Sequence, residues 1–240
     1  MSRLALVEAR LLARDWTVLV FAFLFPVFCM VVLAGVFGDQ PDDGFGSVRP
    51  DDYYVVASLG VPVIALCLIG LPVSLASYRE LGVLRRFEAF GVPAWRVVAA
   101  QALVTLGLVV VGAVLVLALA SFTYGIPSVI YGWQTVVGAV VGVVCLLLLG
   151  VVVGLAVPSA RAAQAVGLLA FFPLYLLGGG GPPRGVMTGP MGDIASALPS
   201  PILALVDPWL GEHQFSGQLV ALGVWAVAAF VTAAVLARRG

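Results

Sequence analysis

The chain has 240 residues, of which 62% are apolar and only 10% are charged, and its twelve arginines balance twelve acidic residues. A soluble domain is about one quarter charged, so these charges are too few to cover the surface of a chain of this length. The composition therefore excludes a soluble enzyme, a secreted disulfide scaffold and a disordered chain, and it predicts an all-α polytopic membrane protein.

Six charge-free runs match the roughly 20 residues that a helix needs to cross a hydrocarbon core of about 30 Å. Because the runs are uniformly apolar and do not alternate, they do not resemble the strands of a membrane barrel. They predict one transmembrane domain over residues 1–240. Its spans are expected at about Trp16–Gly38, Tyr53–Tyr78, Val97–Tyr124, Trp133–Pro158, Ala162–Gly180 and Gly217–Ala237.

The charges are distributed unequally between the two sides of these spans. Ten of the twelve arginines fall at the two termini and in the second and fourth loops, and only Arg49 and Arg184 fall on the other side. The positive-inside rule makes the arginine-rich side cytoplasmic, so both termini are expected inside. Eight of the twelve acidic residues, including the cluster at 39–52, lie on the opposite side.

The segment before the first span, residues 2–15, is too polar to cross the membrane. At 100° per residue, Leu4, Val7 and Leu11 share one stripe, and arginines flank it. This pattern predicts an amphipathic helix in the cytoplasmic interface. It transmits force to the first span in one interpretation and is a simple topological anchor in the other.

A second short helix, Glu80–Gly91, is predicted in the loop after the second span. Leu81, Leu84 and Phe87, followed by Phe90, recur at a spacing of three residues and give a helix with one apolar edge and a charged back. Gly91 and Pro93 end it. Such a helix docks on a soluble partner in one interpretation, and in the other the loop only sets topology.

Small and kinking residues lie within the spans, which carry no Asp, Glu, Lys or Arg. The fourth span contains two small-xxx-small pairs, Gly138 with Gly142 and Gly150 with Gly154, which favour close helix packing. The lack of ionisable residues at membrane depth argues against a proton-driven carrier. The odd count of three cysteines in apolar runs argues against a disulfide framework.

The run from Arg79 to Leu84, Arg-Glu-Leu-Gly-Val-Leu, followed by Gly91-Val92-Pro93, resembles the signature of the ABC-2 type permeases. These are the membrane subunits of ATP-driven exporters. The resemblance implies a cytoplasmic coupling helix that meets an ATPase, and short re-entrant external helices in the region 178–215 before the last span. The ATPase-coupling residues that it implies are Arg79, Glu80, Gly82, Leu84, Arg85, Arg86, Phe87, Glu88, Gly91 and Pro93.

The energy source is expected on another chain. A phosphate-binding loop of the form G-x-x-x-x-G-K-[ST] needs a lysine, and the sequence contains none. The resemblance implies a nucleotide-binding ATPase subunit, which carries ATP and Mg, and a second permease copy that is identical or similar. No catalytic residue, metal site, cofactor or nucleic-acid partner is expected in this chain, and the single His213 is interpreted as an interfacial residue.

We therefore expect a permease of the bacterial cell membrane that moves a lipophilic or amphipathic drug, antibiotic or lipid-like molecule outward. Alternatives are an exporter of lipid-linked glycan, a channel or carrier that acts alone, and a membrane scaffold. Aromatic residues of the first and fifth spans suit such a cargo, although contact with lipid explains them equally. The candidate pathway residues are Phe21, Phe25, Phe28, Phe171, Phe172 and Tyr175.

Overall fold

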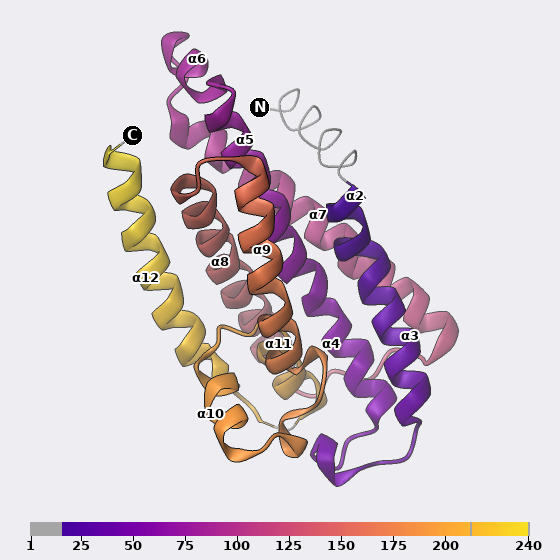
Figure 1. Cartoon of the computed structure of the whole chain (residues 1–240). Helices are drawn as coiled ribbons and strands as arrows, with labels where there is room; N and C mark the ends of the chain where they lie inside the picture. The colour runs from indigo at the N-terminus through magenta and orange to yellow at the C-terminus, as the bar shows by residue number, and fades with distance from the viewer. Residues whose placement is uncertain (1–15, 212, 240) are drawn as a thin grey trace.

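The computed structural model describes residues 16–211 and 213–239, which form one helical bundle (Figure 1). The described residues contain six helices long and apolar enough to cross a membrane, which confirms the predicted all-α, six-span architecture. The predicted interfacial helix at 2–15 lies outside the described residues. The spans are α2–η1–α3 (Trp16–Leu19, Val20–Leu24, Phe25–Phe37), α4–η3–α5 (Pro50–Ala65, Leu66–Gly70, Leu71–Glu80), α7 (Ala94–Thr123), α8 (Gly132–Ala156), α9–η4 (Ala160–Tyr175, Leu176–Gly180) and α12 (Gln218–Arg239).

The second span begins at Pro50, earlier than the predicted Tyr53. Proline is favoured at the first helical position, where no backbone N–H is needed. Asp51 and Asp52 then occupy the first turn, where the positive end of the helix dipole stabilises carboxylates. Arg49, just before the helix, pairs with Asp51 at 2.5 Å. Asp51 and Asp52, whose charges place them outside the span in a hydropathy profile, therefore form the first turn of its helix.

The α4–η3–α5 helix, which we call the central span, lies in the middle of the bundle. Every residue from Tyr53 to Pro72 is buried, and the span packs against α3, α7, α8, α9 and α11. Its middle section, η3, has the wider π-helical winding that is common at functional positions of helices. The central span therefore touches most of the structure while exposing almost nothing to lipid.

Two glycines allow α8 and α9 to approach the backbone of the central span. A Cβ atom on Gly150 of α8 would lie 2.0 Å from the carbonyl oxygen of Cys67, and one on Gly167 of α9 would lie 2.2 Å from that of Leu68. Both distances are far below any van der Waals contact. The π-helical section η3 is thus held between two helices at a separation that only glycine permits.

The other small pair of α8 packs on a different element. A Cβ on Gly138 would lie 2.0 Å from the carbonyl oxygen of Ala204, and one on Gly142 would lie 3.0 Å from Pro201. Both contacts belong to α11 (Pro201–Leu210). The predicted packing role of the two glycine pairs is therefore confirmed, with one pair facing α11 and the other facing the central span.

Short helices fill the region between α9 and α12, as predicted. They are η5 (Arg184–Val186), α10 (Gly189–Ala197) and α11. Residues 201–208 of α11 are all buried, because this helix folds back into the bundle against α4 and α8. Ser200 caps α11 by accepting a hydrogen bond from the N–H of Leu203 at 3.2 Å. The short 3-10 turn η2 (Asp43–Phe45) lies in the loop after α3.

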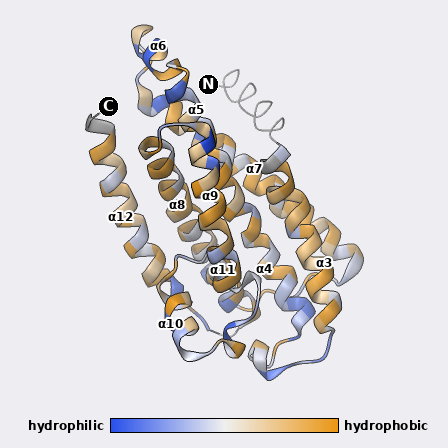
Figure 2. Ribbon diagram, in the orientation of Figure 1, coloured by the Kyte–Doolittle hydropathy of each residue, from blue (hydrophilic) through white to orange (hydrophobic). Residues whose placement is uncertain are grey.

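The two ends of the bundle differ in charge. Polar residues gather at both ends and the spans between them are apolar (Figure 2). The helix α6 (Val83–Ala89) and the end of α12 lie at one end, and α10 lies at the opposite end (Figure 1). Among the described residues, seven arginines belong to the segments at the α6 end, Arg79, Arg85, Arg86, Arg96, Arg161, Arg238 and Arg239.

We predict that Gly150→Ala destabilises the protein by about 1–3 kcal/mol, because the added methyl group forces α8 away from the central span. Thermal unfolding of the purified protein in detergent measures the effect. Gly107→Ala is the matched control, since Gly107 lies in the helix α7 with open space around its Cα. Equal unfolding temperatures for the two variants would contradict the close packing described above.

Candidate functional site

The turn between α5 and α6 depends on Gly82. This residue has φ +67° and ψ +18°, a left-handed conformation that glycine adopts without strain. It ends α5 after Glu80 and redirects the chain into α6, which begins at Val83. The predicted single helix from Glu80 to Gly91 is therefore wrong in extent. Leu81, the first residue of the predicted apolar edge, lies in the turn and is exposed.

The helix α6 projects from the end of the bundle (Figure 1). None of its residues is buried, and its packing partners are α5 and α7. Leu84 and Phe87 are half-buried, whereas Phe90, immediately after the helix, is 86% exposed. Its exposed charged residues are Arg85, Arg86 and Glu88.

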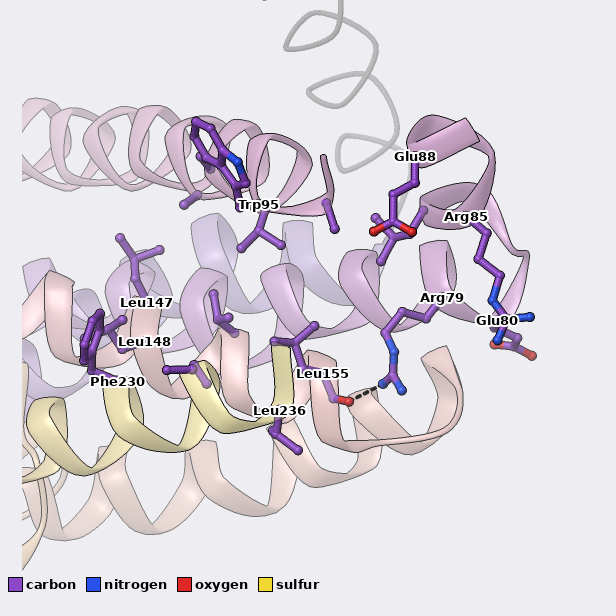
Figure 3. Close-up of a pocket in the computed structure, with 18 of the residues that line it drawn as sticks. Arg79, Glu80, Arg85, Glu88, Trp95, Leu147, Leu148, Leu155, Phe230 and Leu236 are labelled. Carbon is purple, nitrogen blue, oxygen red and sulfur yellow. Dashed lines mark hydrogen bonds between the residues drawn. The ribbon is translucent and has the colours of Figure 1, made fainter. Parts of the chain in front are cut away.

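Arg79 lies at the end of α5 and stabilises the end of α8. Its guanidinium group donates hydrogen bonds to the carbonyl oxygens of Gly154, Leu155 and Val157, with distances of 3.3 Å to Gly154 and 3.1 Å to Val157. The last carbonyls of a helix have no partner within the helix, and a cation there also complements the helix dipole. Figure 3 shows the bond to Leu155. Arg79 therefore acts as the C-terminal cap of α8.

Glu80 stabilises the start of α9 as a hydrogen-bond acceptor, whereas Arg79 stabilises the end of α8 as a donor. Its carboxylate accepts a hydrogen bond from the backbone N–H of Ala160 at 3.0 Å, next to the N-terminal cap Ser159. A negative charge at a helix N-terminus is stabilising. We call these two residues and their bonds to the α8–α9 turn the Arg79–Glu80 clasp. The signature dipeptide thus joins the central span to α8 and α9, while the exposed portion of the segment is α6 itself.

The chain returns to the bundle through Gly91 and Pro93. Gly91 has φ +77°, and the N–H of Val92 bonds to the carbonyl oxygen of Phe87 at 2.9 Å. Pro93 then precedes α7 in an extended conformation. Gly91 and Pro93 end α6, as the sequence pattern predicts, whereas Gly82, which the prediction placed inside the helix, precedes it.

The candidate pathway residues divide into two groups. Rings of α2–η1–α3 and α9 form one aromatic cluster, in which Phe21 lies 5.1 Å from Phe171 and Phe25 lies 5.2 Å from Tyr175 between ring centroids. Phe171 and Tyr175 are buried, so the cluster packs the first span on the fifth. Phe172 contacts the edge of the cluster and is partly exposed, and Phe28 is exposed on α3.

At the opposite end, the glycine run 178–181 is fixed by side chains that the sequence pattern did not single out. The hydroxyls of Tyr53 and Tyr54 donate to the carbonyl oxygens of Gly179 and Gly181 at 2.9 Å and 3.0 Å. The hydroxyl of Ser200 donates to the carbonyl oxygen of Gly178 at 2.6 Å. The start of the central span therefore holds the end of α9–η4. The sequence signal for these contacts is the adjacent pair Tyr53 and Tyr54, which directly follows the acidic first turn of the helix.

A buried carboxylate lies in the same region, outside the membrane-spanning helices. Asp207 of α11 is 4% exposed and accepts a hydrogen bond from the hydroxyl of Ser216 at 2.5 Å. Burial raises the pKa of Asp207 above its ordinary value of 3.8, and the bond from Ser216 and the charges of Arg184 and His213 offset this rise incompletely.

Within the described residues, these features define a helical membrane protein in which a projecting helix, α6, follows the most buried span after a two-residue turn. The chain belongs to the ABC-2 type transporter family, which it matches over residues 3–200. This match confirms the resemblance inferred from the Arg79–Pro93 segment. No curated protein and no solved structure matches the chain.

We predict that the raised pKa of Asp207 makes the protein less stable as pH rises. Because the folded-state pKa lies above the unfolded value, the folded protein binds the extra proton between the two, and stability falls as pH rises from about 3.8 through the folded pKa. Asp207→Asn keeps an acceptor for Ser216 and removes this contribution to the pH dependence.

Thermal unfolding in detergent across acidic to neutral pH measures this effect. Asp193→Asn is the control, since Asp193 is exposed on the neighbouring α10. A profile for Asp207→Asn that coincides with those of the wild type and of Asp193→Asn would contradict the assignment.

Proposed function

We propose that this ABC-type permease exports a lipophilic or amphipathic molecule across a bacterial cell membrane, and that a separate ATPase subunit docks on α6 and supplies the energy. The observation that carries the proposal is that α6 follows the central span after a turn of only two residues, Leu81 and Gly82. A displacement of the projecting helix acts on the one span that contacts α3, α7, α8, α9 and α11.

The distribution of charge supports a cytoplasmic position for α6. The arginine-rich end of the bundle is the α6 end, and the positive-inside rule favours the cytoplasm for it. The last helix, α12, also ends there, so the C-terminus is proposed to be cytoplasmic, as is the N-terminus. A soluble ATPase then meets α6 without crossing the membrane. ATP and Mg bind to that subunit, and this chain acts as the transport subunit rather than as an enzyme.

The exposed surface of α6 suits a protein partner. Phe90 is 86% exposed at a polar end of the molecule, and aromatic side chains of this kind often carry much of the binding energy of an interface. Arg86, four residues before Phe90, adds an exposed positive charge to this surface. A large exposed ring beside a charged side chain is typical of a protein-binding patch.

The clasp explains how movement spreads beyond the central span. Arg79 and Glu80 attach the base of α6 to α8 and α9. Because α9 carries Phe171, Phe172 and Tyr175, a shift of α6 reaches the aromatic cluster through α9. We propose that the pathway forms between two permease copies, with the exposed rings of Phe28 and Phe172 facing it. The second copy is identical or a similar chain.

We predict that Phe90→Ala weakens binding of the ATPase subunit by about 2 kcal/mol, roughly thirtyfold. ATP-dependent transport falls with it, whereas the amount of permease in the membrane and its unfolding temperature stay unchanged. The test is purification of the tagged chain from its own cells, identification of the retained ATPase, and reconstitution of the two subunits.

Phe122→Ala is the matched control, because Phe122 is also 86% exposed but lies at the opposite end of α7. Equal ATPase binding and equal coupled transport in both variants would overturn docking on α6. Transport by the purified chain without an ATPase would overturn the proposed energy source.

A further inference from the structure

A groove of about 920 Å³ lies between α7, α8 and α12 beneath α6. Figure 3 shows α7 on one side of it, α12 on the other, and the charged residues of the α5–α6 segment at one end. Its floor is the face of α8 that includes Val144, Leu148 and Val151. Its walls carry Val98 of α7 and Phe230 of α12. The groove is apolar along its length and polar at one end.

The length of this groove matches one leaflet of a bilayer. The floor extends along α8 from Val144 to Leu155, which is about 16 Å at 1.5 Å per residue. Half of a hydrocarbon core of about 30 Å is about 15 Å. The polar end lies level with the end of the span, where lipid headgroups begin. An occupant of the groove is therefore expected to have an apolar tail whose length equals the thickness of one leaflet. Its polar head lies at the membrane surface.

The polar end offers one cation and one anion. Arg79 and Glu80 are already engaged in the clasp with α8 and α9. Arg85 and Glu88, three residues apart on one face of α6, also line the groove. Among the described residues, the side-chain ion pairs are those of Arg49, so Arg85 and Glu88 remain available to a ligand.

Trp95 completes the mouth of the groove. It lines the opening on the α7 side and is largely exposed. Tryptophan is favoured at the membrane–water interface, and the guanidinium group of Arg96 lies over the ring of Trp95, 5.5 Å from its centroid. A guanidinium that binds phosphate and a carboxylate that binds an ammonium group together complement a zwitterionic headgroup. An anionic headgroup leaves Glu88 without a partner and adds repulsion.

We propose that this groove binds a zwitterionic phospholipid with an ethanolamine headgroup, drawn from the leaflet on the α6 side. One acyl chain lies along α8 between α7 and α12. The phosphate pairs with Arg85, and the ammonium group pairs with Glu88. The bound lipid is a resident of the folded permease, so the proposal does not depend on the identity of the exported cargo or on the ATPase.

The test is titration of delipidated protein in detergent with phosphatidylethanolamine or phosphatidylglycerol, followed by native mass spectrometry. We expect one tight site for phosphatidylethanolamine and at least tenfold weaker binding of phosphatidylglycerol. Glu88→Gln weakens phosphatidylethanolamine tenfold or more and strengthens phosphatidylglycerol, because the repulsion between the carboxylate and the anionic lipid is removed. Arg85→Gln weakens both lipids, because both carry the phosphate.

Two pairs of variants keep the test independent of folding. Ala102→Trp places a ring in the groove and abolishes binding, whereas Leu103→Trp, on the adjacent lipid-facing position, does not. Arg86→Gln is the control for Arg85→Gln, since Arg86 does not line the groove.

Three results of the lipid titrations would overturn the proposal. The first is equal lipid binding by Ala102→Trp and Leu103→Trp, and the second is equal affinity of the protein for the two lipids. The third is that Ala102→Trp abolishes a dimer of the protein and leaves lipid binding intact. The last result would assign the groove to a second copy of the chain. We also expect tetraphenylphosphonium to displace no lipid, and tight binding of this apolar cation in place of lipid would assign the groove to cargo.

Discussion

The close approach of α8 and α9 to the central span is the constraint on which the rest of the structure depends. At Gly150 and Gly167 the backbones meet at separations that leave no room for a Cβ atom. In a membrane, where apolar surface drives little association, such contacts and interhelical hydrogen bonds hold helices together. The fully buried position of the central span follows from them.

Hydrogen bonds at both ends extend this contact along the whole of α9. Glu80 bonds to Ala160 at the start of α9, and the tyrosines at the other end of the central span bond to the glycine run after it. The two antiparallel segments are thus joined near both membrane surfaces and packed through Gly167 between them. We interpret the central span and α9 as one mechanical unit, with α6 as its projecting end and the aromatic cluster on its side.

Length and composition predict the six spans, because these are local properties of the chain. The glycine pairs of α8 are also visible as a spacing, although the sequence does not say that Gly138 faces α11 while Gly150 faces the central span. The clasp was not predictable in the same way. Arg79 finds carbonyl partners more than 70 residues away, and its cap replaces the glycine that usually ends a helix. The only local sign was the turn Val157-Pro158-Ser159, in which α8 ends without such a glycine.

The most direct test of this mechanical unit is a pair of distance measurements between spin labels, in the complex with the ATPase subunit. Labels on the exposed positions of Arg86→Cys in α6 and Leu169→Cys in α9 report on the unit itself. We predict that their distance within one chain stays constant when an ATP analogue binds. The distance between the two Arg86→Cys labels of the paired permeases changes in the same experiment. The account of a rigid unit would be contradicted if the distance between the labels at positions 86 and 169 of one chain changed as much as the distance between the two copies.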